Sequence, residues 1–112
     1  MKTFNVRVLD QLYSVSVGNR SEIGLFDDKL GECNFYDKKI RIVGDLSEIV
    51  EPGVDFSGVL SEVIRHELSH AFLYESGRVS DAENEEMAEY LSVIVPKICA
   101  AEKWIQSNLT SD

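Results

Sequence analysis

The sequence predicts an α+β fold in which a small antiparallel sheet packs on two long helices. Short segments with alternating apolar residues occupy the first half of the chain, and this pattern is typical of strands. In the second half the apolar residues recur every three or four positions, as they do on one face of an α-helix. The 112 residues provide one hydrophobic core, so we expect a single domain, 1–112.

The first half of the chain is predicted to form two hairpins. Phe4, Val6 and Val8 share one face of the first strand, and Ile40 and Ile42 face the core from the last strand. Gly, Pro and Asp residues mark the turns between the elements. The elements expected here are a strand from 4 to 8, a turn at Asp10-Gln11, a strand from 12 to 17, a polar loop over 18–31 with a helical turn at 23–26, a hairpin from Glu32 to Val43 with its bend at 36–39, and a short helix at 46–50.

The next element is predicted to be a helix from Ser57 to Gly77. Its apolar residues recur at helical spacing, from Val59 to Phe72. Either Ser57 or Asp55 is suited to cap its start, and Gly77 stands where a helix stops.

A second long helix is expected at the C-terminal end of the chain. Ser80-Asp81-Ala82-Glu83 forms a capping box, in which Ser80 and Glu83 satisfy each other's backbone amides. The apolar pattern then continues to Ile105. Pro96 is expected to kink or break this helix, because proline lacks the N–H that the helix needs.

Both histidines of the chain lie in one string, His66-Glu67-Leu68-Ser69-His70. On a helix, positions four apart differ by about 40° in azimuth and about 6 Å along the axis, so both imidazoles can bind one ion. Glu67 is rotated by about 100° from His66, where it can reach a water on that ion. This is the HExxH signature of zinc hydrolases. A helix with two unrelated histidines is the alternative, but a charged Glu67 within an apolar helix is costly without a partner.

A catalytic zinc ion normally takes three protein ligands and a water. The chain has no third histidine and no cysteine near the motif, so we expect a carboxylate from the acidic segment that follows it. Negative charge is also favoured at the N-terminus of a helix, so most of these acidic residues need no metal to explain them. The candidate ligands are Asp81, Glu83, Glu85, Glu86 and Glu89.

The string 66–70, followed by Asn84-Glu85-Glu86-Met87-Ala88-Glu89, resembles the two motifs of the gluzincin metallopeptidases. In thermolysin-like members the second motif reads Asn-Glu-x-x-Ser-Asp, and Ala88 and Glu89 stand here in place of the Ser and Asp. The resemblance implies that Glu85 is the third zinc ligand and that Glu89 supports a zinc-binding histidine from the second shell. Glu86 stays an alternative ligand, because both Glu85 and Glu86 flank the apolar stripe of the helix.

The passage from Val59 to Pro96 is also similar to the ImmA-like metallopeptidases of phages and mobile elements. In these proteins a Glu-x-x-Ala helix, here Glu85 to Ala88, follows the motif helix. The resemblance implies a minimal zincin-like fold, a bound Zn²⁺ and a peptide or protein substrate. Zincins bind their substrate as an extra strand at the sheet edge, and the Glu32–Val43 hairpin is the segment best placed for this.

The expected function is zinc-dependent peptide hydrolysis. His66, His70 and Glu85 bind the ion, and Glu67 takes a proton from the water and passes it to the leaving amine. The alternative is a non-catalytic, zinc-stabilised regulatory or protein-interaction module of phage or mobile-element origin. Candidates for stabilising the oxyanion are Tyr36, Tyr74, Arg78 and Tyr90.

Composition argues against several other classes of protein. The net charge of −9 disfavours a nucleic-acid partner, because binding phosphates requires clustered Lys and Arg. No apolar run approaches the roughly 20 residues that cross a bilayer, and the N-terminus lacks a secretory signal, so we expect a cytoplasmic protein. Cys33 and Cys99 are too few for a disulfide framework and are expected to be buried free thiols. No feature of the sequence specifies an oligomeric state.

Overall fold

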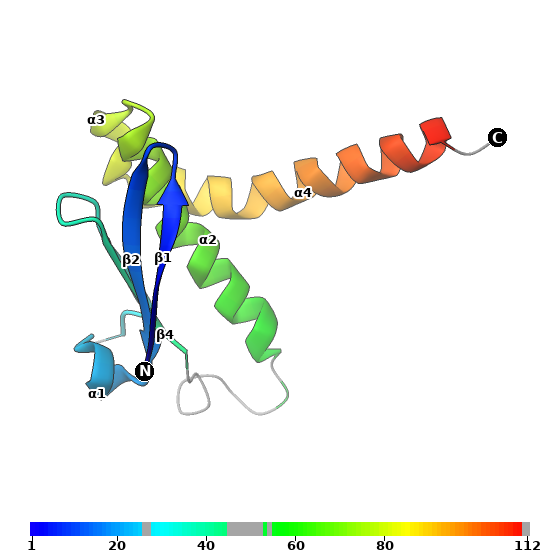
Figure 1. The fold of residues 1–112 in the computed structure, drawn as a ribbon. Coiled ribbons are helices and arrows are strands. Elements are labelled where there is room, and N and C mark those ends of the chain that lie inside the picture. The colour runs from blue at the N-terminus through cyan, green and yellow to red at the C-terminus, as the bar shows by residue number, and fades with distance from the viewer. Residues whose placement is uncertain (26–27, 45–52, 54, 111–112) are drawn as a thin grey trace.

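The computed structural model describes residues 1–25, 28–44, 53 and 55–110. The α+β class predicted from the sequence is confirmed, because a small four-stranded sheet is combined with helices (Figure 1). The short helix expected at 46–50 lies outside the described residues. The elements are β1 (Lys2–Val8), β2 (Gln11–Gly18), α1 (Arg20–Ile23), β3 (Gly31–Asn34), β4 (Lys39–Val43), α2 (Phe56–Glu75), α3 (Val79–Ala82) and α4 (Glu85–Thr110).

The sheet has the strand order β1-β2-β4-β3 and is mixed rather than antiparallel. Both predicted hairpins are present, because β1 pairs antiparallel with β2 and β3 pairs antiparallel with β4. However, β2 pairs parallel with β4, so the prediction of an entirely antiparallel sheet is wrong. Along the chain, α1 and β3 come between β2 and β4. This connection is long enough for β4 to lie beside β2 in the same direction. The alternation of residues within a strand carries no information about which strand will be its neighbour.

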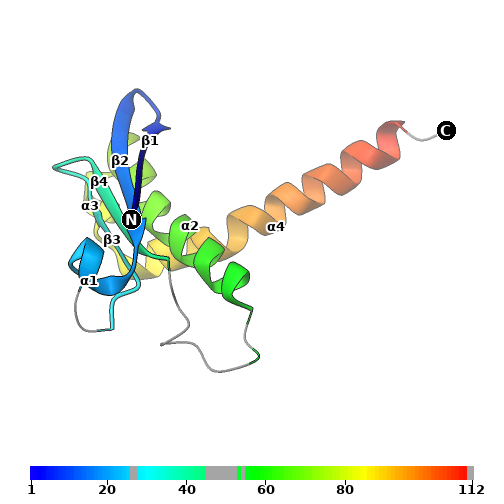
Figure 2. The ribbon, with the colours of Figure 1, turned by 60° about the horizontal axis from the view of Figure 1, so that its bottom comes forward.

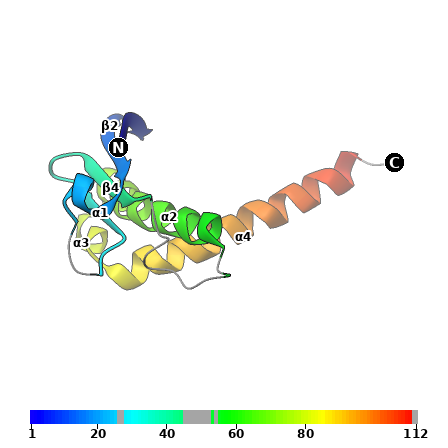
Figure 3. The ribbon, with the colours of Figure 1, turned by 90° about the horizontal axis from the view of Figure 1, so that it is seen from below.

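The sheet packs on α2, and α4 packs mainly on α2 rather than on the sheet. The expectation of a sheet packed on both long helices is therefore wrong for the second one. Figure 3 shows the sheet, α2 and the start of α4 in successive layers. The main core lies between the sheet and α2, with Ile40 and Ile42 facing it as predicted. Its other buried members are Val8, Tyr13, Val15, Phe35, Ala71, Leu73 and Ala82.

The C-terminal part of α4 extends away from the rest of the molecule (Figures 1 and 2). Ile98, Trp104 and Ile105 are exposed along this part of the helix. Even so, no helix among the described residues combines the length and apolar character needed to cross a membrane.

Two local boundaries in the first half differ from the prediction. The helical turn lies at 20–23 rather than 23–26, because Asn19 caps it by accepting a hydrogen bond from the Glu22 backbone N–H at 2.9 Å. The first hairpin turns at Leu9-Asp10, since Gln11 already pairs with Val8.

The last helix begins later than the capping box at Ser80 and Glu83 predicted. Residues 79–82 form a separate single turn, α3. Asn84 caps α4 instead, with its Oδ1 accepting a hydrogen bond from the Met87 backbone N–H at 3.0 Å. As a result, Glu85 is the first residue of α4.

Pro96 lies inside α4 and does not end it. Proline cannot donate a hydrogen bond to the carbonyl four residues earlier, which belongs to Ser92. Arg65 of α2 replaces the missing donor, and its Nε donates to the Ser92 carbonyl oxygen at 2.9 Å. Because Ser92 is almost completely buried, this bond satisfies a carbonyl that water does not reach and ties α4 to α2.

The C-terminal end of α2 is bound to the sheet through Glu75. The Tyr13 hydroxyl donates to Glu75 Oε2 at 2.6 Å, and the Lys38 ammonium pairs with the same oxygen. Lys38 Nζ also lies 4.8 Å from the centre of the Tyr74 ring, which stacks on Phe35. Burial acts to raise the pKa of Glu75, but the hydrogen bonds from Lys38 and Tyr13 outweigh it and lower that pKa below its usual value.

Replacing Arg65 with methionine should lower the free energy of unfolding by about 1–3 kcal/mol, because the buried Ser92 carbonyl loses its donor. A Pro96→Ala change supplies a backbone N–H to that carbonyl, so Arg65→Met should cost less in the Pro96→Ala background. Urea denaturation of the wild type, both single variants and the double variant measures the difference. Equal costs in the two backgrounds would contradict this role of Arg65.

The folded-state pKa of Glu75 lies below its unfolded value of about 4.3, so its carboxylate stabilises the protein above that pH. The contribution is lost as the pH falls through the folded-state value. A Glu75→Gln variant should therefore be less stable than the wild type at pH 7, and its stability should depend less on pH between about 5 and 3. Denaturation curves at stepped pH test this, and a constant gap between the two proteins would rule it out.

Candidate metal centre

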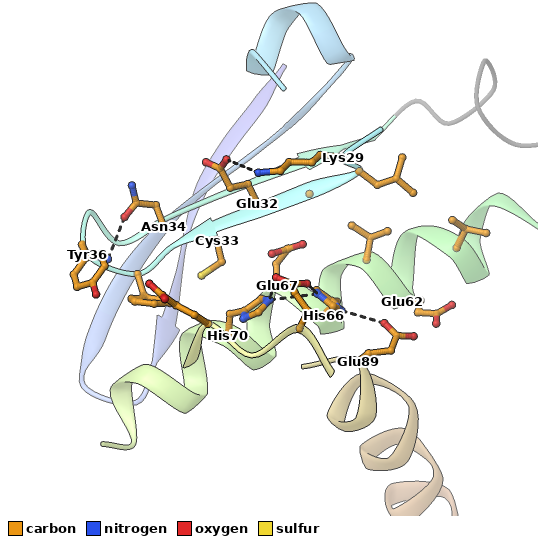
Figure 4. Close-up of a pocket in the computed structure, with 17 residues that line it drawn as sticks. Lys29, Glu32, Cys33, Asn34, Tyr36, Glu62, His66, Glu67, His70 and Glu89 are labelled. Atoms are coloured by element: carbon orange, nitrogen blue, oxygen red, sulfur yellow. Dashed lines mark hydrogen bonds and ion pairs between the residues drawn. The ribbon is translucent and has the colours of Figure 1, made fainter. Parts of the chain in front are cut away.

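The HExxH string lies in the middle of α2, as the sequence predicted. Of the two proposed caps, Asp55 holds the start of this helix, with its Oδ1 accepting a hydrogen bond from the Ser57 backbone N–H at 3.0 Å. His66 and His70 project from one face of α2 toward the start of α4 (Figure 4). The shared face follows from local helix geometry, since the two residues are four positions apart.

Glu85 brings its carboxylate between the two imidazoles. Its Oε2 lies 2.8 Å from His66 Nε2, and its Oε1 lies 3.1 Å from His70 Nε2. The two Nε2 atoms are 3.3 Å apart. One ligand atom from each of the three residues falls within 4.8 Å of the others, so the three side chains can hold one metal ion.

Each histidine makes a second contact through its other ring nitrogen. His70 Nδ1 donates to the Ala82 carbonyl oxygen at 2.5 Å, which leaves the Nε2 lone pair of the neutral ring for another partner. His66 Nδ1 lies 3.1 Å from Glu89 Oε2. Burial acts to lower the pKa of His66, but the hydrogen bonds to Glu85 and Glu89, with the charge of Glu67, raise it overall.

Glu67 points into the cleft beside these groups (Figure 4) and is only 7 % exposed. Its carboxylate makes no hydrogen bond or ion pair with another described residue. Burial raises the pKa of Glu67 to about 7; His66 opposes the shift, while the charges of Glu85 and Glu32 add to it. A buried carboxyl with a pKa near neutral can both accept and release a proton at physiological pH.

Gly31 lets the edge strand β3 approach Glu67 closely. A Cβ at this position would lie 2.9 Å from Glu67 Cγ and Oε2, and equally close to a methyl of Val63. Any larger residue would therefore force the Glu67 and Val63 side chains, or the backbone of β3, to shift. Gly31 was not predicted to be part of the site, although a glycine within a strand is a known signal of close backbone approach.

The open edge of β3 borders the same cleft. Leu30 accepts a hydrogen bond from the Val43 backbone N–H at 2.9 Å. Because bonded and non-bonded pairs alternate in an antiparallel ladder, the backbone groups of Gly31 and Cys33 point away from β4. No strand in the described part of the chain pairs with this side of β3.

The cleft has a volume of about 770 Å³ and is lined by β3, α2 and the segment around the start of α4. Glu85 and Glu89 line the cleft, whereas Glu86 does not. Of the two alternative ligands, Glu85 is therefore the one that lies beside the histidines. Of the four residues considered for the oxyanion, only Tyr36 lines the cleft. Of the other three, Tyr74 stacks on Phe35, Arg78 pairs with Asp81, and Tyr90 lies outside the cleft lining.

Cys33 is a half-buried free thiol that lines the cleft, where it was not expected. The expectation of a buried thiol is wrong for Cys99, which is exposed on α4. Burial raises the pKa of the Cys33 thiol to about 12, and the nearby charge of Glu67 adds to the shift. The thiol is therefore protonated at neutral pH and is a poor nucleophile and metal ligand in this state.

The likeness to gluzincin and ImmA-like metallopeptidases has no wider support from comparison with known proteins. No protein-family model, curated protein or solved structure matches this chain. A function for this protein can therefore be inferred only from the geometry around His66, His70 and Glu85.

Proposed function

We propose that this protein is a zinc-dependent metallopeptidase. His66, His70 and Glu85 are the proposed zinc ligands, and Glu67 is the proposed general base. The observation that carries the proposal is the convergence of the two Nε2 atoms and the Glu85 carboxylate, with a buried carboxylate from Glu67 beside them.

The donor set fits a catalytic rather than a structural zinc ion. Structural sites are closed by four protein ligands and are usually rich in cysteine. Two histidines and one carboxylate are the ligands of a well-known class of catalytic site, in which the fourth position is left for water or substrate. Within the described part of the chain, His66, His70 and Glu85 are the one group with the spacing of metal ligands.

Two further contacts support the proposed ligands. His70 Nδ1 faces the Ala82 carbonyl oxygen and His66 Nδ1 faces a carboxylate oxygen of Glu89, so each contact can orient its ring and leave Nε2 for the metal. Partners of this kind raise the basicity of a ligating imidazole and hold it in place. Glu89 therefore suits the supporting role that the gluzincin motif implies.

In the proposed reaction Glu67 moves the proton. A bound zinc ion lowers the pKa of a coordinated water to about 7 and polarises the substrate carbonyl. Glu67 accepts the proton of the attacking water and delivers it to the leaving amine. Its position suits both steps, because Glu67 is held in the same cleft as His66, His70 and Glu85. Tyr36 is the remaining candidate for donating a hydrogen bond to the oxyanion, since it lines the cleft.

The proposal includes a minimal zincin-like fold with peptide bound along β3. The open edge of this strand runs beside the candidate metal site, where an extended peptide can add as a further strand. A non-catalytic zinc module is the alternative, but it gives no reason for a buried Glu67 without a hydrogen-bond partner among the described residues.

The ligand assignment predicts the zinc content of single variants. Wild-type protein should purify with one zinc per chain, and His66→Ala, His70→Ala and Glu85→Ala should each lose most of it. Glu86→Ala is the matched control and should keep the metal, because Glu86 does not line the cleft. Glu89→Gln should weaken zinc binding by about 10–100-fold, as expected for a partner of a ligating histidine. Elemental analysis and competition with a chelator measure these effects; a zinc-free Glu86→Ala and a zinc-bound Glu85→Ala would reverse the assignment.

The base assignment predicts that Glu67→Gln keeps its zinc and loses its activity. The amide has nearly the shape of the carboxyl but cannot accept the proton, so kcat should fall by about 10²–10⁴-fold. Zinc content and cleavage of a mixed peptide library are measured on the same samples. A fully active Glu67→Gln would disprove the proposed chemistry. A zinc-bound wild type that cleaves no peptide would favour the non-catalytic module.

A further inference from the structure

The cleft carries an excess of negative charge that the proposed zinc chemistry does not use. Its lining contains six glutamates and a single lysine, Lys29. Glu32 pairs with Arg41 at 2.5 Å and with Lys29 at 3.7 Å. Glu85 and Glu89 contact the histidines, and Glu67 is the proposed base. The two remaining glutamates of the lining are Glu62 and Glu83.

Glu62 and Glu83 are exposed, and neither forms an ion pair or hydrogen bond with any residue that the structure describes. They lie beside opposite ends of the histidine pair. Glu62 is one helical turn before His66 on α2, and Glu83 directly follows Ala82, whose carbonyl binds His70. The four residues from Glu62 to His66 rise by about 6 Å along the helix, which an extended peptide spans with about two residues.

Two further features of the cleft point to a ligand. Glu67 is more than nine-tenths buried, points into the cleft and has no hydrogen-bond partner among the described residues. Beside it, the backbone groups of Gly31 and Cys33 form an open strand edge. Glu62 and Glu83 line the same cleft as this edge, so a chain bound along β3 would lie in the cleft with both carboxylates.

We infer that the substrate is an extended peptide with lysine or arginine side chains on both sides of the bond that is cleaved. This inference rests on the proposed function and adds the substrate class. Glu62 and Glu83 each provide a carboxylate for one cationic side chain, while β3 binds the backbone. A second metal ion does not neutralise Glu62 and Glu83, because neither belongs to a group with metal-ligand spacing within the described residues.

Three sets of quenched fluorescent peptides test the inference. The sets have equal length and differ only in carrying Lys/Arg, Ala or Glu at the two positions on each side of the scissile bond. Zinc-loaded wild type should cleave the Lys/Arg set with a kcat/KM about tenfold above the Ala set, since each exposed ion pair contributes roughly two- to fivefold. The Glu set should be cleaved more slowly still, and added salt should reduce the preference.

A double variant and a matched control locate the effect. Glu62→Gln/Glu83→Gln should bring the ratio of kcat/KM between the Lys/Arg and Ala sets close to one. Glu102→Gln removes a charge from the projecting part of α4, far from the cleft, and should keep the wild-type ratio. Equal cleavage of the three sets by the wild type, or an unchanged ratio in the double variant, would overturn the inference while the proposed function stands.

A binding measurement separates the two proposals if no peptide is cleaved. Zinc-loaded Glu67→Gln is titrated with labelled peptides of the Lys/Arg and Glu sets, and fluorescence anisotropy reports affinity without turnover. Absence of cleavage by the zinc-loaded wild type counts against the proposed function alone. The substrate inference is then upheld if the Lys/Arg peptides bind about tenfold more tightly than the Glu peptides, and it is overturned if they bind no more tightly.

Discussion

The packing of α4 on α2 is the contact on which the candidate metal site depends. Helix α2 by itself presents two imidazoles, which is one ligand too few for a catalytic zinc site. The third donor, Glu85, comes from the first residue of α4 and reaches both Nε2 atoms. Asn84 fixes where α4 begins, and the Arg65–Ser92 hydrogen bond holds it against α2. A shift of one residue in the start of α4 would present Glu85 on a different side, since each residue turns a helix by about 100°.

Pro96 has an unexpected part in this packing. Proline inside a helix leaves one carbonyl without a donor, and here that carbonyl, of Ser92, is buried against α2. The vacant acceptor gives Arg65 a place to bind, directly beside His66 in the sequence. The same residue that weakens α4 as an isolated helix thus strengthens its attachment to α2.

The environment of Glu67 depends on a different contact, between α2 and the edge strand β3. Gly31 has no side chain, so β3 can lie against Glu67 and cover most of that side chain. This burial is the main reason that the pKa of Glu67 rises to about 7. The hydrogen bond from Tyr13 and the ion pair from Lys38 to Glu75 hold the C-terminal end of α2 against the sheet. The acid–base character proposed for Glu67 is therefore a property of how the sheet and α2 are packed.

The features that could be predicted from the amino-acid sequence are those that follow from local geometry. The spacing of His66 and His70 placed them on one face of α2, and alternating residues located both hairpins. The motif resemblance favoured Glu85 over Glu86, but the packing of α4 on α2 is what brings the Glu85 carboxylate to the histidines. The parallel pairing of β2 with β4 and the contact of Gly31 with Glu67 were not predicted at all. Helix and strand periods fix the direction of a side chain only relative to its own element. Which elements then meet depends on packing between segments distant in the sequence, and no local pattern records it.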